Sequence, residues 1–400
     1  MKNALRVRPR RHAGRRPGHP IVRALAYTAA AIVGFGGIGA YEYVQTAFDR
    51  VHTENIEPLL GDRPTVPEAP QDGSKGEPIN ILLLGSDTRT GANAAIGGAN
   101  DGMRADTTIL MHVSADRSRV EFVSIPRDSW VRISDCTLFD GTVVRGRTTK
   151  FNAAFANGAR HGNVAEAVAC TQKTFEDLSG LYVHYYAVVD FVGFEGMVNA
   201  LGGVPMCVPG RIVSAEAGLN VYPGPQIFDG ATAIAWARTR KVEVGKQFYN
   251  GTDIKRMAAQ QVLMSHMVET VLSKNILWDA NQIRDFVTAA ADSLTVSPRL
   301  AQADYVIGLA WSLRHIDPNN IVFTTIPFKW TPDGNNVVWN DAGYAMLADL
   351  KNDRPIAGTS VVQASFATTV TAPAPSASLT PGQPTPAVEP SIDPLGACSV

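Results

Sequence analysis

Hydrophobic and polar residues follow two different periods along residues 78–350. Short runs rich in Leu, Ile, Val and Thr that end in turn residues are typical of strands. They cover residues 79–85, 107–114, 119–126, 184–191 and 321–328. Apolar residues spaced three and four positions apart predict helices instead. These cover residues 163–180, 193–203, 253–273, near 279–293, near 298–314 and 341–350. Such an alternation predicts a layered α/β domain over residues 78–350.

Two polar segments delimit this domain. Residues 42–77 contain a stretch rich in Pro, Gly and charge, which cannot build a core and predicts a flexible stalk. Residues 351–400 form a tail that is mostly Pro, Ala, Thr and Ser from Thr368 onward, a composition typical of disordered, extended chain. The tail could thread into a cell wall or have no role, and the sequence leaves both interpretations open.

Positive charge is concentrated at the N-terminus, ahead of an uncharged apolar run. The first 23 residues contain no Asp or Glu, and their basic residues are Lys2, Arg6, Arg8, Arg10, Arg11, Arg15, Arg16 and Arg23. Residues 24–41 contain no charge and are long enough to span a hydrocarbon core of about 30 Å. The positive-inside rule then predicts that residues 1–23 are cytoplasmic, that residues 24–41 form a single transmembrane signal anchor, and that the rest of the chain is extracytoplasmic. A cleaved signal peptide is the alternative, but no convincing cleavage site precedes a polar start.

Net charge and cysteine usage narrow the function classes further. The formal net charge of −1 gives no reason to expect nucleic-acid binding. The four cysteines are Cys136, Cys170, Cys207 and Cys398, and their spacing matches no zinc pattern. Disulfides persist outside the cytoplasm. A bridge between Cys136, after an extended segment, and Cys170, on an expected helix, would contribute about 3 kcal/mol. Whether these two are paired stays open.

Two carboxylates occupy positions where strands meet loops. Asp87 follows the apolar strand at 79–85, and Asp106 opens the next strand. Carboxylates at strand ends can converge on Mg²⁺, which prefers oxygen ligands and keeps several waters. The alternative is that each Asp accepts a local hydrogen bond in its turn, as is common for this residue type.

Basic residues recur at the same kind of edge. They are Arg89, Arg104, Arg127, Lys150, Arg238, Arg240 and Arg256. Guanidinium groups suit phosphate oxygens because they donate two parallel hydrogen bonds. If residues 237–240 are extended, Arg238 and Arg240 point to one face. Arg256 and Gln260 share a helix face because they are four residues apart. A solvated basic surface is the alternative interpretation.

No familiar nucleophile motif is present. The chain has no Gly-x-Ser-x-Gly, no His-Glu-x-x-His and no Walker loop, and its histidines are scattered. What remains is a pair of carboxylates with several cations, which is the composition expected for polyphosphate chemistry.

Seven motifs follow one another from residue 80 to residue 263: NILLLGSDTR, RADTTILMHVS, VSIPRDSWV, KFNAAFANG, YYAVVDFVGFEGMVNALGGV, FDGATAIAWARTR and GTDIKRMAAQQVL. In these motifs and in their order the sequence resembles the LytR-CpsA-Psr family of cell-wall glycopolymer phosphotransferases, in the form found in actinobacteria. The resemblance is strong over residues 78–275 and looser beyond them.

The resemblance implies a mixed central sheet flanked by helices. It implies an enzyme that takes a glycopolymer from a polyprenyl-pyrophosphate carrier and transfers its phosphoryl unit to peptidoglycan. Mg²⁺ or Mn²⁺ would bind Asp87 and Asp106, and these two would act in catalysis with Arg104 and Arg127. The implied pyrophosphate ligands are Arg104, Arg127, Lys150, Arg238, Arg240, Arg256 and Gln260. The prenyl chain would lie in an apolar pocket lined by Phe191, Phe194, Met197 and Val198, unless at least half of these are ordinary core.

The sequence departs from the family pattern at two positions. Ala259 stands where the last motif usually has a second Arg, and Trp236 stands where a Tyr is usual. Two other functions remain open beside the transferase. With water as the acceptor, the same site would make the protein a pyrophosphatase. Alternatively, the protein could be a non-catalytic, lipid-binding tether of the cell wall. The identity of the polymer cannot be inferred from these residues.

Overall fold

The computed structural model describes residues 45–63, 76–87, 103–208, 210–244, 247–250, 253–273 and 280–360. The expected anchor at residues 24–41, Arg89, Cys398 and residues 361–400 of the expected tail therefore lie outside the described residues. The prediction of a disordered tail was wrong for residues 351–360, because Thr359 and Ser360 form a strand that pairs with residues 322–323. Among the helices that are described, none is long and apolar enough to cross a membrane.

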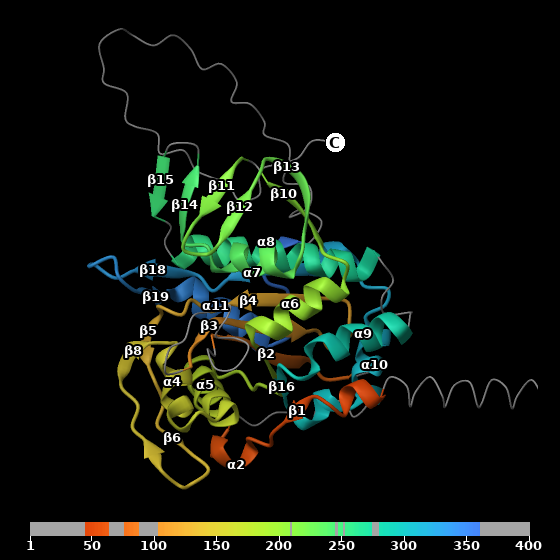
Figure 1. Cartoon of the computed structure of the whole chain (residues 1–400). Helices are drawn as coiled ribbons and strands as arrows, with labels where there is room; N and C mark the ends of the chain where they lie inside the picture. The colour runs from red at the N-terminus through yellow and green to blue at the C-terminus, as the bar shows by residue number, and fades with distance from the viewer. Residues whose placement is uncertain are drawn as a thin grey trace, which may run out of the picture. The chain divides into compact units, whose positions relative to one another are not determined.

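An eight-stranded mixed sheet forms the centre of the domain (Figure 1). Its strands, in spatial order, are β1 (His52–Thr53), β16 (Leu294–Val296), β9 (Tyr185–Val189), β2 (Ile79–Ser86), β3 (Ala105–Val113), β4 (Val120–Ser124), β17 (Ile321–Thr325) and β20 (Thr359–Ser360). Strand β2 pairs antiparallel with β3 and parallel with β9, and β4 pairs parallel with β17. The layered α/β architecture with a mixed sheet was predicted from the sequence.

The two faces of the sheet are both covered, because alternate residues of each strand point to opposite sides. Leu82 and Leu84 of β2 pack into a core with α2 (Glu57–Leu60), α4 (Ala153–Gly158), α5 (Val164–Ser179) and α11 (Asp341–Lys351). Ile79 and Ile81 pack on the other side against α8 (Asp253–Ser273) and α10 (Ala303–Ser312). This explains why β2 has a continuous apolar sequence rather than an alternating one.

A second core lies over α8, on the side away from the central sheet. It joins α8 to α6 (Phe191–Ala200), α7 (Gly230–Arg238) and several short strands, while α9 (Ala280–Ala291) packs on α6. These strands are β10 (Val204–Val208) with β13 (Gly224–Phe228), and β12 (Leu219–Val221), β11 (Ile212–Ser214), β14 (Lys241–Val244) and β15 (Gln247–Asn250). Figure 1 shows α7 and α8 between these strands and the central sheet. The sequence analysis did not anticipate them.

Three small two-stranded hairpins lie outside the central sheet. They are β5 (Trp130–Arg132) with β8 (Thr148–Lys150), β6 (Cys136–Thr137) with β7 (Val143–Val144), and β18 (Phe328–Trp330) with β19 (Val337–Trp339). A disulfide joins Cys136 to Cys170 of α5, with an S–S distance of 2.05 Å and a Cα–Cα distance of 5.2 Å. The pairing that the sequence left open is therefore present, and it fixes the β6–β7 hairpin to α5.

The first part of the expected stalk is folded rather than flexible. Strand β1 pairs with β16, and Leu59 and Leu60 of α2 are buried in the main core. Arg63 forms an ion pair of 2.6 Å with Glu176 of α5. The prediction of a stalk from residue 42 to residue 77 was wrong for residues 45–63, because the Pro- and Gly-rich composition begins only at residue 61.

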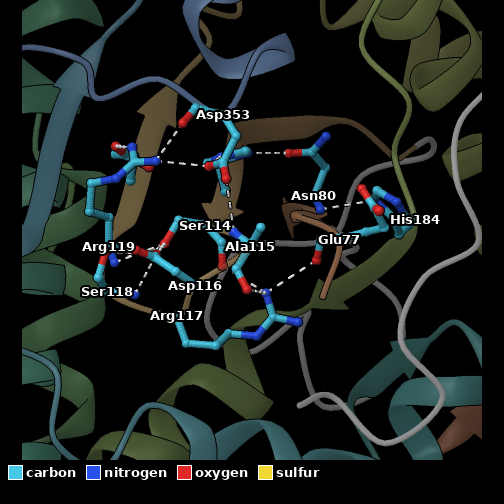
Figure 2. A network of polar contacts seen from close by, with 12 residues as sticks. Glu77, Asn80, Ser114, Ala115, Asp116, Arg117, Ser118, Arg119, His184 and Asp353 are labelled. Atoms are coloured by element: carbon cyan, nitrogen blue, oxygen red, sulfur yellow. Dashed lines mark hydrogen bonds and ion pairs between the residues drawn. The ribbon is translucent and has the colours of Figure 1, made fainter. Parts of the chain in front are cut away.

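A polar network fixes the C-terminal end of α11 to the sheet (Figure 2). Asp353 accepts hydrogen bonds from Arg119 at 2.8 Å and from the backbone N–H of Ala115 at 3.0 Å, and it lies 3.2 Å from the His112 ring. The other ring nitrogen of His112 lies 2.7 Å from Asn80 of β2. This network lies at the opposite end of β2 and β3 from Asp87 and Asp106, so it serves the fold rather than the candidate site.

Candidate functional site

A cavity of about 520 Å³ lies between α8, α6, α7 and the edge of β2, β3 and β9. Several of its polar residues lie near where β2 ends and β3 begins, namely Asp87, Asp106, Arg238, Arg240, Arg256 and Gln260. Asp190 and Glu216 also line the cavity. The remaining lining is mostly apolar, with Met264, Met267, Val268, Val271 and Leu272 contributed by α8. The cavity is therefore amphipathic, with one charged end and a hydrophobic remainder.

The C-terminal end of β2 places Asp87 at the charged end. The register of β2 and β3 shifts between Gly85 and Ser86, which lets the chain leave the sheet at Asp87. The backbone N–H of Arg104 donates to the Asp87 carboxylate at 2.6 Å, and the Asp87 N–H donates back to the Arg104 carbonyl at 2.9 Å. Arg104 itself is exposed and does not line the cavity. Its contact with Asp87 is made by the backbone rather than by the guanidinium.

Asp106 is the centre of a cluster of cations. Arg127 donates to its carboxylate at 2.7 Å, Arg240 at 3.3 Å, and a guanidinium nitrogen of Arg256 lies 3.5 Å away. Burial opposes ionisation of Asp106, but the charges of Arg127, Arg256 and Arg240 outweigh it and hold its pKa below the usual value. Asp106 is therefore an ionised carboxylate that organises the arginines.

Asp253 is a second carboxylate in this cluster. It is the first residue of α8, and its Oδ1 lies 2.9 Å from Arg127 and 2.7 Å from Arg256. Its side chain is only 9% exposed, and burial raises its pKa despite the opposing charges of Arg256 and Arg127. Asp253 thus bridges the two arginines that contact Asp106, and it fixes the N-terminus of α8 beside the cavity.

Arg238 and Arg240 line the cavity from the C-terminal end of a helix. Arg238 is the last residue of α7 and Arg240 lies just beyond the helix, so the extended conformation on which a shared face of the two arginines depended is not present at Arg238. Both side chains nevertheless line the cavity. Helix α7 ends at Arg238, and the next residue, Thr239, has an extended backbone conformation.

Gln260 connects three elements at the charged end. Its side-chain N–H donates to the Ala237 carbonyl at the end of α7 at 2.9 Å, and its oxygen accepts from the Thr107 hydroxyl of β3 at 3.2 Å. Arg256 and Gln260 both line the cavity from one face of α8, which is the arrangement predicted from their spacing.

Lys150 and Arg127 do not line the cavity itself. Arg127 instead contacts Asp106, which lines the cavity, and Asp253, which does not. Lys150 lies further out on β8 and donates to Asp128 at 2.7 Å. The expectation that Lys150 lines the pyrophosphate site is therefore corrected. The strand that contains Lys150 belongs to the small β5–β8 hairpin rather than to the central sheet.

Three of the four apolar residues expected in the pocket do line the cavity. These are Phe191, Phe194 and Met197 of α6. Val198 is fully buried in the second core instead, where Phe194 packs against the same cluster. The expectation that at least half of the four are ordinary core was therefore wrong, because only Val198 is absent from the cavity lining.

The role of Asp253 in this cluster was not predicted from the sequence. A usable signal was present, since Asp253, Arg256 and Gln260 follow one another at spacings of three and four residues and so share one helix face. The position of Asp128 was also missed. It follows Arg127 directly in the chain, but only the tertiary contact with Lys150 reveals where it lies.

Comparison with known proteins places this site in a family. A family model described as the LytR_cpsA_psr family matches residues 44–353. The probable cell wall biosynthesis protein LcpB of Corynebacterium glutamicum is 29% identical over 277 residues, covering 67% of this chain and 59% of that protein. The polyisoprenyl-teichoic acid–peptidoglycan teichoic acid transferase TagU of Bacillus mycoides is 28% identical, covering 58% of this chain and 66% of that protein. The chain spans less than two thirds of the length of these relatives.

The fold also matches a solved structure. TagT bound to LIIa-WTA is 20% identical with a TM-score of 0.51, covering 74% of this chain and 98% of that chain. At this identity the likeness concerns the fold alone. The family model covers most of the chain and includes every described element that lines the cavity. The chain therefore belongs to the LytR-CpsA-Psr family.

Proposed function

We propose that this protein transfers a glycopolymer phosphoryl unit from a polyprenyl-pyrophosphate carrier to peptidoglycan. The observation that carries the proposal is the amphipathic cavity, whose charged end and apolar remainder match a pyrophosphate attached to an isoprenoid chain. The names of the relatives agree with it, since TagU is described as a transferase of polyisoprenyl-linked teichoic acid to peptidoglycan.

The arginines have the arrangement that a buried pyrophosphate needs. A pyrophosphate diester carries roughly two negative charges near neutral pH, and burying them without partners is costly. Arg238, Arg240 and Arg256 reach the cavity from the end of α7 and from α8, so they can approach the phosphates from two sides. Charge-assisted hydrogen bonds of this kind contribute about 1.5–3 kcal/mol each.

The acidic residues position these arginines before the donor arrives. Asp106 contacts Arg127, Arg240 and Arg256, and Asp253 contacts two of the three. The guanidinium groups are therefore held in place at a site that excludes much of the solvent, and little reorganisation is required when a phosphate binds.

In the proposed reaction, a hydroxyl of peptidoglycan attacks the phosphorus that bears the glycopolymer. The bond between this phosphorus and the bridging oxygen breaks, and the carrier leaves as polyprenyl phosphate. The hydroxyl proton is released, and a phosphodiester links the polymer to peptidoglycan. Charge that develops on the leaving phosphate would be stabilised by Arg238, Arg240 and Arg256.

We also propose that Mg²⁺ or Mn²⁺ binds at Asp87 and Asp106. The donor set fits such an ion, because both carboxylates line the charged end of the cavity and Mg²⁺ is commonly held by one or two carboxylates plus substrate phosphates. When bound, the ion would supply neutralising charge to the pyrophosphate. Asp106 would serve both the ion and the arginines.

The proposed location is the outer face of the cell membrane, anchored by residues 24–41. The Cys136–Cys170 disulfide supports an extracytoplasmic domain, because structural disulfides persist mainly in oxidising compartments.

The function is tested with the full chain in detergent, a polyprenyl-pyrophosphate oligosaccharide as donor and uncross-linked peptidoglycan as acceptor. Polyprenyl phosphate and peptidoglycan-linked saccharide are measured by mass spectrometry. Equal amounts of the two products are expected. Release of carrier without linked saccharide would identify a pyrophosphatase, and tight lipid binding without either product would identify a non-catalytic tether.

A further inference from the structure

An exposed tryptophan lies beside the charged site but outside the cavity. Trp130 of β5 is 41% exposed, although large aromatic side chains are usually well buried. It lies directly opposite Lys150 of β8 in an antiparallel pair, so the two side chains share one face of this hairpin. The family resemblance assigns Lys150 to the pyrophosphate site, but Lys150 does not line the cavity.

A chain of ion pairs connects this face to the reacting centre. Lys150 donates to Asp128 at 2.7 Å, Asp128 lies 3.8 Å from Arg127, and Arg127 donates to Asp106 at 2.7 Å. Trp130 follows Arg127 by only three residues, and the backbone between them is fixed by hydrogen bonds. The Ser129 carbonyl accepts from the N–H of Phe151 at 2.8 Å. A molecule resting on Trp130 would therefore lie next to the charged end of the cavity.

We propose that Trp130, Asp128 and Lys150 form a subsite for a sugar ring of the acceptor glycan strand. This inference rests on the proposed transferase function and adds the place where its acceptor binds. The apolar face of a pyranose ring packs against an indole ring, while its hydroxyls need donors and acceptors at the rim. Lys150 supplies donors and Asp128 supplies acceptors, and both are partly exposed, at 43% and 19%.

Other partners fit this face less well. A stable protein interface buries roughly 800 Å² on each side and has an apolar centre, whereas here the exposed ring of Trp130 lies opposite the charged side chain of Lys150. An anionic lipid surface would need a cluster of cations, but Lys150 is neutralised by Asp128. A neutral glycan matches both the exposed ring and the paired charges.

The test separates acceptor binding from donor chemistry. The full chain is prepared as wild type, Trp130→Ala, Trp130→Phe and Trp311→Ala. Trp311 of α10 is the matched control, since it is 53% exposed and belongs to a helix that packs on the opposite side of the domain from β5 (Figure 1). Binding of soluble, uncross-linked peptidoglycan fragments is measured by calorimetry without donor. Carrier release by hydrolysis is measured without acceptor.

Trp130→Ala is expected to weaken fragment binding and raise the acceptor KM by about tenfold or more, which corresponds to about 1.4 kcal/mol. Trp130→Phe keeps an aromatic face and is expected to lose only two- to threefold, by roughly the difference between the two ring areas. Donor affinity and hydrolysis in the absence of acceptor should be unchanged in both. Trp311→Ala should match wild type throughout.

Two results overturn the subsite. One is fragment binding and acceptor KM that are unchanged in Trp130→Ala, and the other is wild-type protein that binds no fragment at millimolar concentration. Failure of the proposed function gives a different result, because the wild type would then bind fragments through Trp130 but form no linked product. The binding measurement therefore decides the subsite even if transfer is not observed.

Discussion

The ion pair between Arg256 and Asp253 gives the sharpest stability prediction. Arg256 is 4% exposed and Asp253 is 9% exposed, and their charged groups lie 2.7 Å apart. Replacing Arg256 by Met keeps most of the side-chain volume but removes the charge. Loss of one partner of a buried ion pair typically costs about 3–5 kcal/mol, because the other charge is left uncompensated. Since Arg127 remains 2.9 Å from Asp253, we expect the lower end of this range.

A loss of about 3 kcal/mol corresponds to a fall in Tm of about 6–12 °C, at roughly 2–4 °C per kcal/mol for a domain of this order of size. Repulsion among clustered cations alone would predict the opposite sign, a raised Tm. Because Arg256 is paired with Asp253 and Asp106, its replacement should lower the Tm instead. Arg240 provides the contrast, because it is 36% exposed and lies 3.3 Å from Asp106. Its replacement by Ala should cost less than about 1 kcal/mol.

The assay is thermal unfolding followed by circular dichroism for Arg256→Met, Asp253→Asn, the double variant and Arg240→Ala. Asn is close in shape to Asp and removes the stranded charge, so the double variant should recover a substantial part of the lost Tm. The size of this recovery is the coupling between the two side chains. The reasoning is refuted if Arg256→Met melts like wild type, or if the two single losses simply add in the double variant.

Three further predictions follow from other parts of the structure. Asp106→Asn should lower transfer activity by orders of magnitude while circular dichroism stays native, and excess Mg²⁺ should rescue it only partly; full activity would show that this carboxylate is a turn residue only. Replacing Cys136 and Cys170 by Ser should lower the free energy of unfolding by up to about 4 kcal/mol, from the 34-residue separation, when measured by urea denaturation. The pKa of Asp353 is lowered, because its contacts with His112, Ala115 and Arg119 outweigh burial. Its stabilising contribution should therefore be complete above its unfolded pKa of about 3.8 and be lost as pH falls through the folded pKa, so the stability difference between wild type and Asp353→Asn should vanish in acid.

The central sheet was predictable because its strands have a strong local signal. Residues 79–85 are a continuous apolar run, and the strand β2 is buried on both faces as such a run requires. The helix at residues 253–273 was predicted with the observed limits, since its apolar period and the acidic residue at its start agree. Long periodic segments define elements without help from tertiary contacts.

The hairpins and the folded part of the stalk were not predictable in the same way. Strands β5, β8, β18 and β19 have three residues each, which is too short for a period to be recognised. Residues 45–63 are held by partners that are distant in sequence, such as β16 for β1 and Glu176 for Arg63. Composition could not show that these partners exist.

The candidate site shows the same division. Asp87, Asp106, Arg256 and Gln260 were found from strand ends and helix spacing, and the structure brings them to one cavity. Lys150 was assigned to the pyrophosphate by resemblance, but a motif does not reveal which neighbour a flexible side chain contacts. The structure pairs it with Asp128, on the face that we assign to the acceptor.

In the proposed function, the charged end of the cavity binds the pyrophosphate while the apolar remainder holds the prenyl chain. The direct measurement is the Kd of the full chain for a prenyl pyrophosphate, compared with the matching prenyl monophosphate and with inorganic pyrophosphate, in wild type, Arg238→Ala and Arg240→Ala. The prenyl pyrophosphate should bind most tightly, and loss of either arginine should weaken it by roughly one to two powers of ten, at about 1.4 kcal/mol per tenfold. If the three ligands bind alike, or if both variants bind as wild type does, the cavity is not the donor site.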